Sequence, residues 1–183
     1  FYKKNNKLNV YLLHSRLSII DLKEQSNQPF EDGDYIVVFN GEIYNYLELK
    51  KKLQNLGHTF KTLSDTEVLL KSYIQYGEKC VDHFNGMWAF VILDKKKGSL
   101  FISRDRFGEK PLYFYKNDKE FIFGSEIKFI KNLIGQKLEI NKKQIFRSLN
   151  LGYRAIHQSR ETYFNNIYSL ESGSNITIQK NLK

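Results

Sequence analysis

Cysteine, proline and arginine are all scarce in this sequence. Among its 183 residues there are one cysteine (Cys80), two prolines and six arginines. A single cysteine excludes an internal disulfide framework and is typical of a reducing compartment, so we expect a cytoplasmic protein. No apolar run approaches the roughly 18 residues that a membrane-spanning helix needs, and the first residues do not have the pattern of a signal peptide. We therefore expect no membrane partner.

The positive charge of the chain comes mostly from lysine. The formal net charge is +9, and the lysines are spread along the chain in short runs such as 50–52 and 95–97. No arginine-rich patch with interleaved aromatic residues occurs, and no nucleic-acid-binding motif is present. Scattered lysine of this kind is typical of a solvated surface. We expect no nucleic-acid partner.

The composition is that of a folded domain. Hydrophobic residues make up 41% of the chain and aromatic residues 15%, which excludes disorder as a description of the whole chain. A chain of this length forms one domain or slightly more. It begins with Phe1 rather than methionine, so we expect a fragment or a processed product.

The first half of the chain has two strand patterns followed by a group of helix patterns. Apolar spacing and capping residues predict the following elements: strands at 8–14 and 35–39, a helix from Glu42 to Leu56 that ends at Gly57, a helix opened by a capping box at Ser64–Glu67 and closed at Gly77, and a short helical segment with Cys80 and Phe84.

The second half is richer in β patterns. Two hairpins are predicted at 87–105 and 111–126, followed by helices at 127–133 and 142–149 and a last strand at 175–179. Antiparallel hairpins with grouped helices favour an α+β fold over a doubly wound parallel sheet.

An Asn-Gly pair stands where the strand at 35–39 is predicted to end. Asn-Gly is the strongest short-range hairpin signal, yet a helix pattern follows it. The Asn40 amide and the Gly41 N–H could both donate to one point, which is the arrangement of an oxyanion hole. The N-terminus of the expected helix would add a field that favours negative charge. An ordinary loop turn explains the pair equally well.

Three charged residues near element ends could bind an amino acid. The guanidinium of Arg16 suits a carboxylate, and the carboxylates of Glu42 and Asp65 suit an ammonium. Each also has a simpler explanation, as a surface arginine or as an acidic residue in a first helical turn. Farther along, Arg104 and Asp105 are expected to form an internal ion pair that holds their loop.

Six segments occur together in a characteristic order: HSRLSIID, FNGEIYNY, LSDTEVLL, FNGMWAF, SRDRFGEKPLYF and FGSEIK. In this order and spacing they resemble the glutaminase domain of glutamine-hydrolysing asparagine synthetase. That domain is a class II glutamine amidotransferase with the N-terminal-nucleophile hydrolase fold. The resemblance implies an αββα sandwich, with two stacked antiparallel sheets between helical layers. Residues 1–183 would be a partial domain of this type, incomplete at its N-terminus.

The resemblance also implies a role for each candidate residue. By position, Arg16 matches the residue that binds the glutamine α-carboxylate, and Asn40 and Gly41 match the oxyanion hole. Glu42 and Asp65 match the carboxylates that hold the α-amino group.

The nucleophile of the family has no counterpart in this sequence. The resemblance implies an N-terminal cysteine whose thiolate attacks the glutamine carboxamide. Cys80 lies in a helical segment with apolar neighbours, so we expect a packing thiol, and no dyad between Cys80 and His14 is expected. The chain alone is therefore predicted to be inactive.

The activity that the resemblance implies is hydrolysis of glutamine to glutamate and ammonia, with ATP-dependent amidation of aspartate on a separate synthetase domain. No S-G-G-x-D-S pyrophosphate loop occurs here, so ATP and magnesium are assigned to that domain and no cofactor to this one. The expected partners are glutamine, the synthetase domain of the same polypeptide and a second copy in a homodimer of the full-length enzyme. Two alternatives remain: an amidotransferase for another acceptor, such as a polysaccharide sugar, and a non-catalytic truncated remnant.

Overall fold

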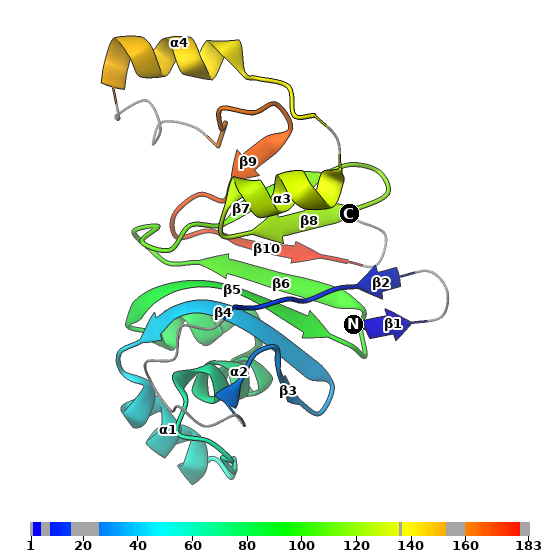
Figure 1. The fold of residues 1–183 in the computed structure, drawn as a ribbon. Coiled ribbons are helices and arrows are strands. Elements are labelled where there is room, and N and C mark those ends of the chain that lie inside the picture. The colour runs from blue at the N-terminus through cyan, green and yellow to red at the C-terminus, as the bar shows by residue number, and fades with distance from the viewer. Residues whose placement is uncertain (1, 5–7, 16–25, 136, 153–159, 180–183) are drawn as a thin grey trace.

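The computed structural model describes residues 2–4, 8–15, 26–135, 137–152 and 160–179 (Figure 1). Its strands are β1 (Tyr2–Lys4), β2 (Leu8–Val10), β3 (Phe30–Asp32), β4 (Tyr35–Ile43), β5 (Gly86–Asp94), β6 (Ser99–Arg104), β7 (Tyr113–Lys116), β8 (Phe121–Gly124), β9 (Ile167–Ser169) and β10 (Asn175–Ile178). Its helices are α1 (Tyr46–Asn55), α2 (Asp65–Tyr76), the 3₁₀ helix η2 (Gly77–His83), α3 (Ile127–Ile134) and α4 (Lys142–Leu151).

The strands form antiparallel sheets. A five-stranded sheet has the order β10-β6-β5-β4-β3, a three-stranded sheet has the order β8-β7-β9, and β1 pairs with β2. Both predicted hairpins are present, as β5–β6 and β7–β8. The helices predicted at 127–133 and 142–149 and the last strand are also confirmed.

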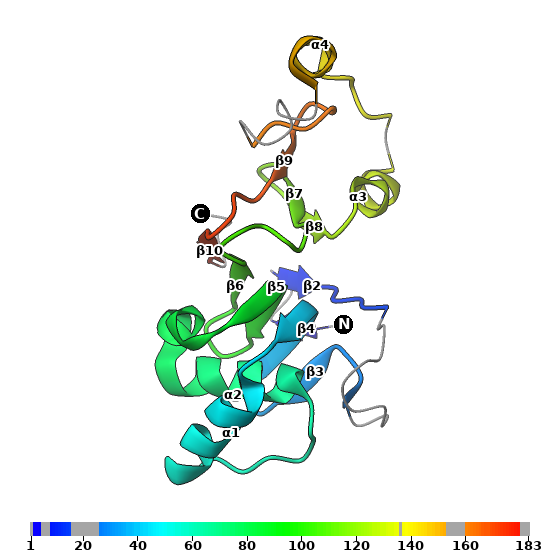
Figure 2. The same ribbon diagram turned by 90° about the vertical axis from the view of Figure 1, so that its left-hand side faces the viewer.

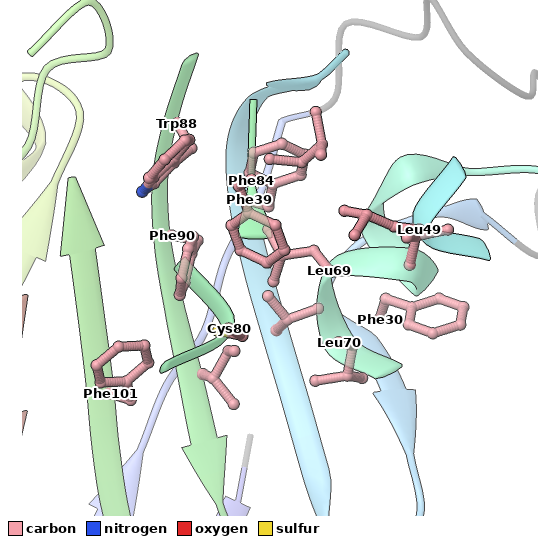
Figure 3. Packing of buried hydrophobic residues seen from close by; sticks show 14 of the residues in the cluster. Phe30, Phe39, Leu49, Leu69, Leu70, Cys80, Phe84, Trp88, Phe90 and Phe101 are labelled. Atoms are coloured by element: carbon pink, nitrogen blue, oxygen red, sulfur yellow. The ribbon is translucent and has the colours of Figure 1, made fainter. Parts of the chain in front are cut away.

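One face of the five-stranded sheet packs against α1 and α2. Val37 and Phe39 of β4 and Phe90 of β5 belong to this core, together with leucines from both helices (Figure 3). Successive side chains of a strand point to opposite faces, which explains why Val38 lies in a different cluster from Val37 and Phe39. The helical layer therefore covers one side of the sheet.

The opposite face packs against the second sheet. Val38, Val91 and Ile102 form a cluster with aromatic side chains that include Phe114 of β7 and Phe123 of β8. Helix α3 lies on the far side of β7 and β8 from the five-stranded sheet, and α4 lies above β9 at the top of the view (Figure 2). The order of layers confirms the predicted α+β fold, the αββα sandwich of two antiparallel sheets between helices.

The strand that carries Asn40-Gly41 is longer than expected. The predictions of a strand at 35–39 and a helix from Glu42 are wrong at their shared boundary, because β4 runs through Asn-Gly to Ile43 and α1 begins at Tyr46. Asn40 and Gly41 are paired with Ala89 and Trp88 of β5. Pairing with a buried neighbouring strand outweighs the local turn preference of Asn-Gly.

Three smaller predictions also need correction. The strand expected at 8–14 is paired only over Leu8–Val10, and the short strands β3 and β9 were not predicted. Ser64 does cap α2 by accepting from the Thr66 N–H, but Glu67 does not complete a capping box. Its carboxylate instead accepts from the Lys61 and Thr62 N–H groups.

In the part of the chain that the structure describes, no helix is long and apolar enough to cross a membrane.

Candidate active site

The Asn40 side chain connects the two sheets. Asn40 lies near the end of β4, and its Nδ2 donates a hydrogen bond to Ser125 Oγ at 3.3 Å. Ser125 lies in the turn between β8 and α3, so it belongs to the second sheet and its helix. This bond orients the amide that was predicted to stabilise an oxyanion. Ser125 was not identified from the sequence, because its partner is 85 residues away.

The backbone of Gly41 faces the open edge of β4. Pairing of β3 with β4 stops at Val37, so the edge beyond it has no neighbouring strand among the described residues. On that edge the Phe39 N–H donates a hydrogen bond to the Gln28 side chain, and the Ile43 N–H donates one to the Asp65 carboxylate. Alternate residues of a strand direct their N–H groups to the same side, so the Gly41 N–H points to this edge as well.

The opposite strand supports this assignment. Trp88, which pairs with Gly41, uses its own N–H and C=O for bonds to Asp105 on the β6 side. The Gly41 N–H therefore makes no ladder hydrogen bond to β5. Among the described residues it is a donor that remains available to a substrate oxygen, as an oxyanion hole requires.

Only glycine fits at position 41. A Cβ there would overlap the carbonyl oxygen of Met87 and come within 2.8 Å of Trp88 Cα and of Phe39 Cε2. Two of these three atoms belong to the backbone of β5 and cannot rotate away. The glycine thus permits the close approach of two backbones next to the proposed oxyanion site.

Asp65 lies beside Glu42 at the start of α2. Its Oδ2 accepts a hydrogen bond from the Ile43 N–H at 3.1 Å, which fixes the helix end against the end of β4. Burial raises the pKa of Asp65, and the negative charge of Glu42 raises it further, although hydrogen bonds from the Ile43 and Thr66 N–H groups act in the opposite direction. A buried carboxylate with a second, partly exposed carboxylate beside it favours binding of a cation such as an ammonium.

The helix that supports this site is not the one predicted. The sequence pattern predicts a helix from Glu42 whose N-terminus is directed at Asn40-Gly41, but α1 begins only at Tyr46. The helix end that contacts β4 here is that of α2, whose first residue is Asp65. Its positive end stabilises the carboxylate of Asp65.

The structure brings together four of the five predicted residues. Asn40, Gly41 and Glu42 are consecutive in β4, and Asp65 contacts the next residue. Arg16 lies outside the described residues. Its role in binding a carboxylate stays a prediction.

The predicted ion pair between Arg104 and Asp105 is wrong. In the described part of the chain these two side chains make no salt bridge with each other, and both bond to backbone. Arg104 donates to the carbonyls of Gly108 and Lys110, at 2.8 and 2.7 Å. Asp105 accepts from backbone N–H groups, including those of Trp88 and Lys110. Burial lowers the pKa of Arg104, with the charge of Asp105 opposing that shift.

Cys80 is a core residue. Its side chain is fully buried in the cluster between the sheet and α2 (Figure 3). Burial raises the pKa of the thiol to about 12, so it is protonated at neutral pH. A nucleophilic cysteine needs a lowered pKa and access to substrate. His14 does not activate it, since its Nε2 bonds to the Phe39 carbonyl at 2.9 Å.

The whole described chain matches one family. Residues 2–183 match the family described as "Glutamine amidotransferase domain". Asparagine synthetase [glutamine-hydrolyzing] 2 of Bacillus subtilis is 42% identical over 167 residues, which cover 89% of this chain and 22% of that protein. A Methanocaldococcus jannaschii protein, provisionally named asparagine synthetase [glutamine-hydrolyzing] 2, is 45% identical over 181 residues, covering 89% of this chain and 34% of its own length.

The fold comparison agrees with the sequence comparison. Glutamine phosphoribosylpyrophosphate amidotransferase of B. subtilis, solved with ADP and GMP, superposes with a TM-score of 0.63 at 20% identity, covering 91% of this chain and 32% of that one. An allosteric regulatory enzyme of purine biosynthesis superposes with a TM-score of 0.56 at 19% identity, covering 88% of this chain and 28% of its own. At these identities the likeness concerns the fold.

The fold is thus that of the N-terminal-nucleophile glutamine amidotransferases, with two antiparallel sheets between helices. Within that class, the chain belongs to the glutamine amidotransferase domain family, and its curated relatives are asparagine synthetases matched over their glutaminase region. The chain spans about a third or less of the length of these relatives.

Proposed function

We propose that this chain is the glutamine-binding part of an asparagine synthetase-type amidotransferase that releases ammonia from glutamine. The observation that carries the proposal is the arrangement at the end of β4. Gly41 directs an N–H to an open edge, the Asn40 amide is oriented by Ser125, and the buried carboxylate of Asp65 lies next to Glu42.

Each end of a glutamine molecule has a matching group in this arrangement. The carboxamide carbon becomes tetrahedral when a nucleophile attacks, and its oxygen gains negative charge. Donors on Asn40 and Gly41 stabilise that charge. The α-ammonium binds between Glu42 and Asp65, and Arg16 binds the α-carboxylate. Fixing both ends brings the carboxamide to a defined position for attack.

The attacking thiol is not Cys80. The side chain is buried on the helical side of the sheet, and its pKa is far above neutral. We therefore assign the nucleophile to residues outside these 183, in line with the N-terminal cysteine that the family resemblance implies. The family likeness also supports passage of the ammonia to a synthetase part that uses ATP and magnesium to amidate aspartate. A cytoplasmic location, supported by the single free cysteine, and a homodimer of the complete enzyme belong to the same proposal.

The test is glutamine hydrolysis by the complete gene product that includes these residues. We expect release of glutamate and ammonia from glutamine, and we expect Cys80→Ala to retain the turnover number because the thiol does not contact substrate. The glutamate formed is measured with a coupled dehydrogenase, and circular dichroism shows whether the variant is folded. Loss of all hydrolysis in a folded Cys80→Ala variant would contradict the proposal.

A further inference from the structure

A glutamine side chain of the protein itself bridges the two halves of the proposed site. Gln28 Oε1 accepts from the Phe39 N–H at 2.6 Å, and Gln28 Nε2 donates to the Phe39 carbonyl at 3.0 Å. The same Nε2 lies 3.4 Å from Thr66 Oγ1. Phe39 directly precedes Asn40 and Thr66 directly follows Asp65. One carboxamide thus touches the neighbours of both functional groups.

The position of Gln28 follows from the register of the sheet. In the β3–β4 pair, Phe30 is opposite Val37 and Asp32 is opposite Tyr35. Two further steps along this register would place Gln28 opposite Phe39. The intervening Pro29 has no N–H and cannot continue the ladder. The Gln28 side chain replaces the lost peptide, because a carboxamide has one donor and one acceptor side by side, as a peptide group does.

The site needs such a link because the side chain of glutamine limits the distance between its α-ammonium and its carboxamide. The α-ammonium and the carboxamide oxygen of one substrate molecule must bind at the same time, at α2 and at β4. Strand β3 stops short of this region, so it cannot hold the end of β4. Among the described residues, the start of α2 is linked to this part of β4 directly by the bond of Asp65 to Ile43, and indirectly by Gln28, which bonds to both Phe39 and Thr66.

We propose that Gln28 is a positioning residue that keeps the oxyanion donors of β4 and the ammonium-binding end of α2 at the spacing of a bound glutamine. This inference rests on the proposed function of the site. Gln28 does not contact substrate. It acts through the backbone of Phe39 and the hydroxyl of Thr66. Its effect therefore depends on a substrate that has both the carboxamide and the α-ammonium.

The test compares two ligands in the complete gene product. Glutamine has both the amide and the α-ammonium, whereas 4-carbamoylbutanoate has the same amide and carboxylate but no amine. Gln28→Glu preserves the shape of the side chain and removes both amide donors. We expect this change to raise KM for glutamine about tenfold and to leave the inhibition constant of 4-carbamoylbutanoate nearly unchanged.

Two further variants complete the design. Thr66→Val removes only the bond to α2 and leaves the pairing of Gln28 with Phe39, so it is expected to fold and to raise KM for glutamine in the same direction by a smaller factor. Gln54→Glu makes the same substitution at an exposed position of α1 and should change neither constant.

Three outcomes are decisive. A selective rise of KM for glutamine in Gln28→Glu and Thr66→Val supports the inference. Equal changes for both ligands, or a lower melting temperature with an unchanged KM, would show a purely structural role and overturn it. Failure of the unmodified gene product to hydrolyse glutamine would instead refute the proposed function, and the inference with it.

Discussion

At the scale of single residues, Gly41 combines a structural and a functional requirement. Its Cα lies so close to β5 that a side chain would meet the backbone of Met87 and Trp88. The same position directs an N–H to the open edge where the substrate oxygen is proposed to bind. A change at this residue therefore affects the sheet and the site together.

We predict that Gly41→Ala destabilises the chain by about 1–3 kcal/mol, because the added methyl group must displace β5 backbone. Gly33→Ala is the matched control. Gly33 also has a positive φ, of +57°, but a Cβ there meets nothing within 4 Å. Its cost should be limited to the conformational penalty of about 1–2 kcal/mol.

Urea unfolding followed by circular dichroism measures both changes. The larger loss should be seen in Gly41→Ala. Equal midpoints for the two variants would mean that the approach of β4 and β5 is not as close as the structure shows.

At the scale of elements, the turn that follows β6 is built around Asp105. Its carboxylate accepts from the N–H groups of Trp88, Phe107, Glu109 and Lys110. Burial alone would raise the pKa of Asp105, but these four hydrogen bonds outweigh it and the pKa lies below its usual value. The turn is therefore held by an ionised carboxylate next to the strand that pairs with Gly41.

We predict that Asp105→Asn lowers the free energy of unfolding by about 1–3 kcal/mol, because an amide NH₂ group must face backbone donors that need an acceptor. Asp118→Asn, at an exposed loop position, should change it little. Thermal unfolding at neutral pH compares the two variants, and similar melting temperatures would contradict this account of the turn.

The pH dependence has a defined sign. The pKa of Asp105 is lower in the folded chain than in the unfolded one, so its stabilising contribution is present above the unfolded value and is lost as the pH falls through the folded value. In Asp105→Asn this part of the acid destabilisation should be absent.

Elements with a strong local pattern could be predicted from the sequence, and those set by distant partners could not. The hairpin β5–β6 has long apolar runs on either side of a glycine-containing turn, and α2 has a serine cap and a terminal glycine. The sequence does not predict the end of β4, because Asn-Gly favours a turn locally, whereas pairing with Ala89 and Trp88 of β5 keeps it extended. Strands of three residues such as β3 leave too short a pattern to detect.

At the scale of the whole molecule, the proposed site exists only where the layers meet. Asn40 and Gly41 come from the central sheet, Asp65 from the helical layer, and Ser125 from the turn that leaves the second sheet. The residue types at Asn40, Gly41 and Asp65 could be predicted to bind an amino acid. Their convergence and the roles of Gln28 and Ser125 could not, because the contacts join residues 11 to 85 positions apart.

The site also reduces the stability of the fold. The pKa of Asp65 is raised in the folded chain, so its favourable contribution is complete below the unfolded value and is lost as the pH rises through the folded value. The ionised form of this largely buried carboxylate beside Glu42 is therefore the destabilising one. In the proposed site a bound ammonium would compensate this charge.

The most direct test of the account is the affinity for glutamine of Asp65→Asn in the complete gene product. The asparagine can still accept from the Ile43 N–H, but it removes the negative charge that binds the ammonium. We predict that KM for glutamine rises about tenfold or more, while the melting temperature at neutral pH is unchanged or higher. An unchanged KM together with a lower melting temperature would show that Asp65 is a structural cap and would contradict the proposed glutamine site.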